Sequence, residues 1–166
     1  MADPHKIPPH KQLEIINRVK NRIKNHPVVI EMFKEYGVDP EEINLVPMCF
    51  ADLPVSARTD HGIIYFNFKL LEDGFEDDDH YIVHELTHYL QQTTGTRPTK
   101  GSDEDDYLDN KEEIEGFQNQ TEYLADTRNE DAAEDYVDQV LDHHEVSDKK
   151  ERDKRKKQLL QLAFST

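Results

Sequence analysis

Apolar residues recur at the three- and four-residue spacing of amphipathic helices near the start of the chain. In residues 11–24 the recurring apolar positions are Leu13, Ile16, Val19 and Ile23. This segment therefore predicts a helix, which Pro27 interrupts. Residues 28–36 predict a second, shorter helix that Gly37 ends. The preceding residues 1–10 are rich in Pro and His and predict an unstructured lead-in.

The middle of the chain changes to strand-like patterning. Residues 62–68, Gly-Ile-Ile-Tyr-Phe-Asn-Phe, are the clearest strand because they are rich in β-branched and aromatic side chains. The sequence just before them, Thr59-Asp60-His61-Gly62, has the composition of a tight turn. Residues 55–58 are therefore expected to pair with this strand as a hairpin. A further strand is expected at residues 44–50.

The rest of the chain predicts helices separated by polar loops. A loop at residues 74–79 precedes a helix at about residues 79–92, with Asp77 or Asp78 as its N-cap. Residues 93–109 predict a polar loop. The helices expected after it span residues 110–128, residues 130–146 and the charged tail 147–166. Together these elements predict an α+β fold, one domain over residues 1–166, with a small mixed or antiparallel sheet packed on the helix of residues 79–92.

That helix contains the sequence His84-Glu85-Leu86-Thr87-His88. Positions four apart lie one turn apart on the same face of a helix, so both imidazoles can bind one metal ion. Glu85 lies about 100° around the helix from His84, within reach of a metal-bound water. Zinc lowers the pKa of such a water, and Glu85 can then remove its proton. The spacing therefore predicts a zinc site with Glu85 as general base.

The alternative is a surface helix that happens to carry two histidines. The neighbouring residues argue against it, because most of the helix circumference is apolar. The apolar positions are Ile82, Val83, Leu86, Tyr89 and Leu90. Tyr81, His84, Glu85 and His88 share the remaining stripe. Ionisable groups beside so much apolar surface favour a metal site.

A catalytic zinc usually has three protein ligands and one open position. No histidine follows at the short spacing of HExxHxxGxxH, so the third ligand is expected from a later helix. Glu113 shares its helix face with the inward-facing positions Phe117, Gln120 and Leu124. Glu115 shares a face with Glu122 and Asp126 that is expected to be solvated, and Glu112 lies at the border. Glu113 is therefore the first choice and Glu115 the second.

With these motifs, the chain resembles a zincin metallopeptidase of the gluzincin type, from the strand of residues 62–68 to the helix of residues 110–128. Its size is similar to that of the minimal gluzincins and of short HExxH proteins encoded by bacteriophages. The resemblance implies His84, His88 and Glu113 as ligands of Zn²⁺, and Glu85 as general base of peptide-bond hydrolysis. It also implies that the strand before the motif helix lines the cleft and that an extended peptide or protein substrate pairs with its edge. A non-catalytic zinc-binding scaffold, such as a phage structural or regulatory protein, is the alternative.

Charge restricts the possible partners further. The net charge of -16 disfavours nucleic acids and anionic membranes. One basic run, residues 149–157, holds seven basic and two acidic residues; a solvated helix face or pairing with the acidic body is favoured over nucleic-acid binding. No stretch is long enough to span a membrane and no signal peptide is evident, so a soluble protein of the cytoplasm, or of the virion if phage-encoded, is expected. The oligomeric state stays open.

The remaining candidate residues give weaker signals. The single cysteine, Cys49, lies in an apolar run and is expected to be buried and unreactive. Tyr107 and Tyr123 are candidate oxyanion donors, although packing is the favoured role for both. Residues 93–109 carry an acidic cluster and could form a lid, an inhibitory flap or a solvated loop, with a preference for basic substrates as a further hypothesis. The pair His143 and His144 is interpreted as interacting with a helix end.

Overall fold

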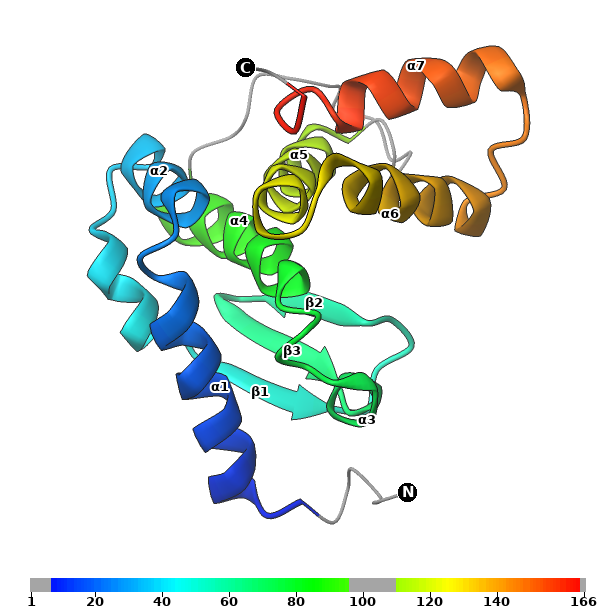
Figure 1. Cartoon of the computed structure of the whole chain (residues 1–166). Helices are drawn as coiled ribbons and strands as arrows, with labels where there is room; N and C mark the ends of the chain where they lie inside the picture. Colours follow the sequence, from blue (N-terminus) through cyan, green and yellow to red (C-terminus); the bar gives the residue numbers. More distant parts are fainter. Residues whose placement is uncertain (1–6, 96–109, 165–166) are drawn as a thin grey trace. The chain divides into compact units, whose positions relative to one another are not determined.

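The computed structural model describes residues 7–95 and 110–164 of the chain, without the side chains of Glu72, Asp73 and Lys111 (Figure 1). The chain divides into two compact units, Met1–Thr96 and Arg97–Thr166. The described residues are mostly helical and include one three-stranded sheet. The α+β class is therefore confirmed at this level, and the single domain stays a prediction.

The first unit begins with two helices, each of which has a proline in its first turn. Helix α1 (Pro9–Ile23) has Pro9 in its first turn, and α2 (Pro27–Glu35) begins at Pro27. Proline suits the first helical position because its φ angle is already near the helical value. The lead-in predicted for residues 1–10 is therefore wrong at Pro9 and His10, and residues 1–6 lie outside the described residues. The predicted inward positions Ile16, Val19 and Ile23 are buried, as expected, whereas Leu13 is exposed.

The sheet has the order β1-β3-β2. Strand β1 (Met48–Ala51) runs parallel to β3 (Ile63–Asn67), and β2 (Ala57–Asp60) runs antiparallel to it, so the sheet is mixed. Strand β3 is thus the central strand, and its two edges are occupied by β1 and β2. The expectation that substrate pairs with the edge of this strand is therefore wrong.

The predicted hairpin is confirmed, shifted along the chain by two residues. Asp60 pairs with Ile63, and the two residues between them, His61 and Gly62, have φ angles of 51° and 76°. Positive φ at both central positions is the geometry of a type I′ turn, which matches the twist of paired strands.

The strand predicted from residue 44 starts later, at Met48. Asn44 and Leu45 belong instead to the 3-10 helix η2 (Pro40–Leu45). The side chain of Asp39 caps this helix by accepting a hydrogen bond of 2.9 Å from the backbone N–H of Glu41.

Cys49 in β1 is exposed, which corrects the prediction that it is buried. The side chains of a strand alternate between faces, and it is the neighbours Met48 and Phe50 that are buried. The pKa of the Cys49 thiol is raised by desolvation, which keeps it protonated and weakly nucleophilic.

Helix α4 (His80–Thr94) carries the HExxH sequence and packs against β2 and β3 (Figure 1). Ile82, Val83, Leu86 and Leu90 are fully buried, which confirms that this is a central helix. A short helix that the sequence did not predict, α3 (Lys69–Asp73), lies between the sheet and α4 along the chain.

The N-cap residue of α4 is Asp79, so the prediction of Asp77 or Asp78 is wrong. The Asp79 side chain makes no capping hydrogen bond. Its carboxylate instead accepts a hydrogen bond of 2.9 Å from Arg22 of α1, which also donates to the backbone carbonyl of Glu76. The start of α4 is therefore fixed by a long-range ion pair that local spacing does not reveal.

The second unit contains three mutually packed helices: α5 (Lys111–Thr127), α6 (Glu130–His143) and α7 (Lys149–Leu159). Each begins at a side-chain cap, from Asn110, Asn129 and Asp148 respectively, as expected for these residue types. Their shared core is formed by Ile114, Phe117, Leu124, Ala133, Val137, Leu141, Leu159 and Leu160. The three predicted helices are confirmed.

The basic run of α7 pairs with the acidic helix α6. Arg152 donates to Asp138 at 3.1 Å and to Asp142 at 2.8 Å. Lys156 forms ion pairs of 3.1 Å with Glu134 and 3.2 Å with Asp138. Pairing with the acidic body is therefore confirmed for these two basic residues.

Candidate metal centre

His84 and His88 lie one turn apart on α4, and their Nε2 atoms are 3.2 Å apart. His84 is buried and His88 is half-buried. Two nitrogens bound to one tetrahedral zinc, each about 2.0–2.1 Å from it, are about 3.3–3.4 Å apart. The two rings thus already present their nitrogens at the separation that one shared ion requires.

Gln91 determines which nitrogen of His88 is available. The Nδ1 atom of His88 lies 2.8 Å from Oε1 of Gln91, three residues further along the same helix. An amide oxygen can only accept, so Nδ1 carries the proton and Nε2 keeps its lone pair. Such a hydrogen bond to the second ring nitrogen is the usual support of a metal-binding histidine. No sequence pattern singled out Gln91, although its three-residue spacing from His88 on a helix could have revealed this contact.

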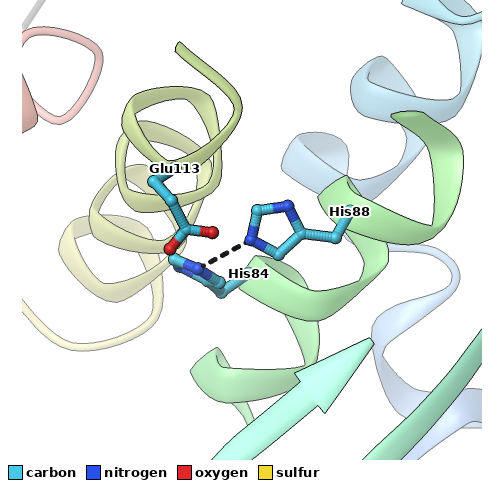
Figure 2. A group of neighbouring side chains, drawn as sticks. All are labelled: His84, His88 and Glu113. Carbon is cyan, nitrogen blue, oxygen red and sulfur yellow. Dashed lines mark hydrogen bonds between the residues drawn. The ribbon is translucent and has the colours of Figure 1, made fainter. Parts of the chain in front are cut away.

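The two histidines and Glu113 form one group of candidate ligands. Figure 2 labels the three side chains, two from α4 of the first unit and one from α5 of the second. Glu113 is half-buried in the first turn of α5, where its backbone N–H and that of Glu112 bond to the side chain of Asn110. The group could hold a metal ion, and it includes Glu113 but not Glu115.

Glu85 is buried, with 6% of its surface exposed. Its Oε1 atom accepts a hydrogen bond of 2.8 Å from the hydroxyl of Thr59 in β2. The same hydroxyl lies 3.1 Å from the backbone carbonyl oxygen of Glu85. The sequence indicated Thr59 only as part of a turn, because no spacing rule connects residues 26 positions apart.

Gln92 fastens the β2–β3 hairpin to the motif helix. Its Nε2 donates to the carbonyl of Thr59 at 3.0 Å, and its Oε1 accepts from the N–H of Gly62 at 3.2 Å. A single side chain of α4 thus satisfies two backbone groups at the turn. No spacing rule in the sequence connects Gln92 to this turn, because the bonded residues are 30 and 33 positions away along the chain.

Of the other candidate residues, Tyr123 is buried, while Tyr107 and the acidic residues within 96–109 lie outside the described residues. His143 and His144 are exposed, and neither belongs to a group of potential metal ligands among the described residues. In the described part of the chain no helix is both long and apolar enough to cross a membrane.

No family model, curated protein or solved structure matches this chain.

Proposed function

We propose that the chain is a zinc-dependent peptidase with a zincin-like arrangement, in which His84, His88 and Glu113 bind the metal and Glu85 is the general base. The observation that carries the proposal is the 3.2 Å separation of the two Nε2 atoms on the helix that also bears the buried carboxylate of Glu85. The His₂Glu donor set suits zinc and corresponds to a known class of catalytic zinc sites.

The chemistry divides between the metal and Glu85. Zinc, when bound, would supply a Lewis acid that makes a water nucleophilic near neutral pH and polarises the scissile carbonyl. Glu85 takes a proton from the attacking water and delivers it to the departing amine nitrogen, so that the peptide and one water become a carboxylate and an amine. The polar partner of Glu85 in β2, Thr59, meets the requirement that a buried carboxylate be hydrogen-bonded.

Strand β2 is the part of the sheet that suits an extended substrate. It is an edge strand and packs against the motif helix, whereas β3 is paired on both sides. A peptide added as a further strand gains backbone hydrogen bonds whatever its sequence. We therefore place the substrate on β2 instead of the central strand.

The competing function is a zinc-binding scaffold without activity. Only the enzyme needs Glu85, since a structural zinc site has no use for a general base beside its ligands. The discriminating experiment measures zinc content and hydrolysis of unfolded protein substrates for wild type, Glu85→Gln, Glu113→Ala and Glu115→Ala. We expect Glu85→Gln to keep zinc and lose activity by at least about 100-fold.

The two glutamates of α5 provide a matched pair. Glu113→Ala should lose zinc and activity together, whereas Glu115→Ala should keep both. Equal inactivity of zinc-loaded wild type and Glu85→Gln would favour the scaffold. Loss of zinc from Glu115→Ala, with Glu113→Ala still loaded, would show that the ligand is Glu115.

A further inference from the structure

Within the described residues, the hydroxyl of Thr59 donates a hydrogen bond to the Glu85 carboxylate. It has two acceptors on the same residue, Oε1 at 2.8 Å and the backbone carbonyl oxygen at 3.1 Å. A threonine hydroxyl has a single proton to donate. Donation to an ionised carboxylate is the stronger interaction, so the shorter contact to Oε1 dominates while Glu85 is ionised.

The position of Thr59 is fixed by its backbone. Thr59 is paired with Ile64 in the register of the hairpin, and its carbonyl accepts a hydrogen bond of 3.0 Å from Gln92. Ala57 and Thr59 are the partly buried residues of β2, and Arg58 and Asp60 alternate with them as exposed residues. The hydroxyl is therefore presented to α4 by a strand that α4 itself fastens at the turn.

We propose that Thr59 is a positioning residue that holds the Glu85 carboxylate by Oε1 and so reserves Oε2 for proton transfer. This inference rests on the proposed function. A glutamate side chain has three rotatable bonds, and a displacement of about 1 Å at a reacting group can cost about 100-fold in rate. A fixed donor hydroxyl on a strand removes this freedom, and the hydroxyl itself takes no part in the reaction at the substrate or the metal.

Thr59→Val tests the proposal because valine has nearly the same shape, lacks the hydroxyl and favours strands. In the zinc-loaded protein we expect kcat to fall at least about 10-fold, the effect of losing a hydrogen bond to a charged group, with KM and zinc content unchanged. Thr59→Ser keeps the hydroxyl and should recover most of kcat. Thr93→Val is the matched control, since the Thr93 hydroxyl bonds to the backbone carbonyl of Tyr89 in its own helix and to no other described residue. An unchanged kcat in Thr59→Val, or an equal loss in Thr59→Ser, would overturn the positioning role.

A second measurement needs neither metal nor activity. Thr59→Val and Glu85→Leu are combined in a double-mutant cycle, and the urea unfolding of the metal-free proteins is compared. A double variant that loses less stability than the sum of the single variants supports the contact, and strictly additive losses overturn it. If wild type is inactive while the cycle shows coupling, the proposed function fails and the positioning role of Thr59 in catalysis fails with it. If wild type is active and the losses are additive, only this inference fails.

Discussion

The Nε2 atoms of His84 and His88 face each other at 3.2 Å, while Nδ1 of His88 is engaged by Gln91 at 2.8 Å. One ring is thereby fixed in the tautomer that a metal ligand needs. The two histidine donors are thus placed within two turns of a single helix, whose apolar residues fix it in the core of the first unit.

Replacing either motif histidine should abolish tight zinc binding. His84→Ala or His88→Ala removes one of three proposed ligands, and we expect the dissociation constant for zinc to rise by at least about 100-fold. Isothermal titration calorimetry at fixed pH measures the change. His143→Ala, at an exposed histidine of α6, is the control that should leave zinc binding unchanged. Unaltered binding in both motif variants would place the metal elsewhere.

Gln91→Leu should weaken zinc binding without removing a ligand. The change leaves Nδ1 of His88 without its acceptor, so the ring loses its preferred tautomer and orientation. We expect an affinity loss of about 10-fold, in the range found for partners of metal-binding histidines. The neighbouring Gln92 bonds to the hairpin turn and not to His88, so Gln92→Leu should retain the affinity of wild type. The same calorimetry applies, and equal losses in the two variants would contradict a specific role for Gln91.

Asp138→Asn should destabilise the second unit. Asp138 accepts from both Arg152 and Lys156, so its neutralisation weakens two ion pairs. The pairs are partly exposed, and we expect a loss of about 0.5–1 kcal/mol that shrinks at high salt. Urea unfolding at low and high ionic strength gives the value. Asp135→Asn is the matched control, because Asp135 lies about one turn before Asp138 on the same helix and is exposed. A loss of stability in Asp138→Asn that does not depend on salt would indicate a packing effect instead.

Stability should depend on pH through Lys20. Its ammonium is buried and donates to the carbonyl of Val46, and burial lowers its pKa from the usual 10.5. The unfolded chain then binds more protons than the folded one between the lowered pKa and 10.5. Stability contributed by this group therefore rises as the pH increases through that interval.

The comparison with Lys20→Met isolates this effect. The unfolding free energy of wild type minus that of the variant should increase as the pH rises from about 7 to about 10. Tyr89, whose pKa is raised by burial and by Glu42, is present in both proteins and cancels in the difference. A flat difference over this range would show that Lys20 keeps its usual pKa in the folded protein.

The helices follow from the sequence because their information is local. Apolar residues such as Ile16, Val19 and Ile23 recur with the helical period, and the same period places His84 and His88 on one face. The hairpin is predictable for a related reason, since His61-Gly62 is a turn that tolerates positive φ. Glu113 was selected by helix phase alone, and its role as the third ligand stays a prediction.

The tertiary structure decided what depends on residues distant in the chain. Thr59 donates a hydrogen bond to Glu85, 26 positions away in the sequence, and Arg22 donates one to Asp79, 57 positions away. Neither contact produces a periodic pattern in the sequence. The placement of β3 between β1 and β2 likewise depends on which strands pair, because an apolar strand pattern is the same at the centre and near the edge of a sheet. The sequence alone thus determined that His84 and His88 share one face of α4, and packing determined what surrounds Glu85.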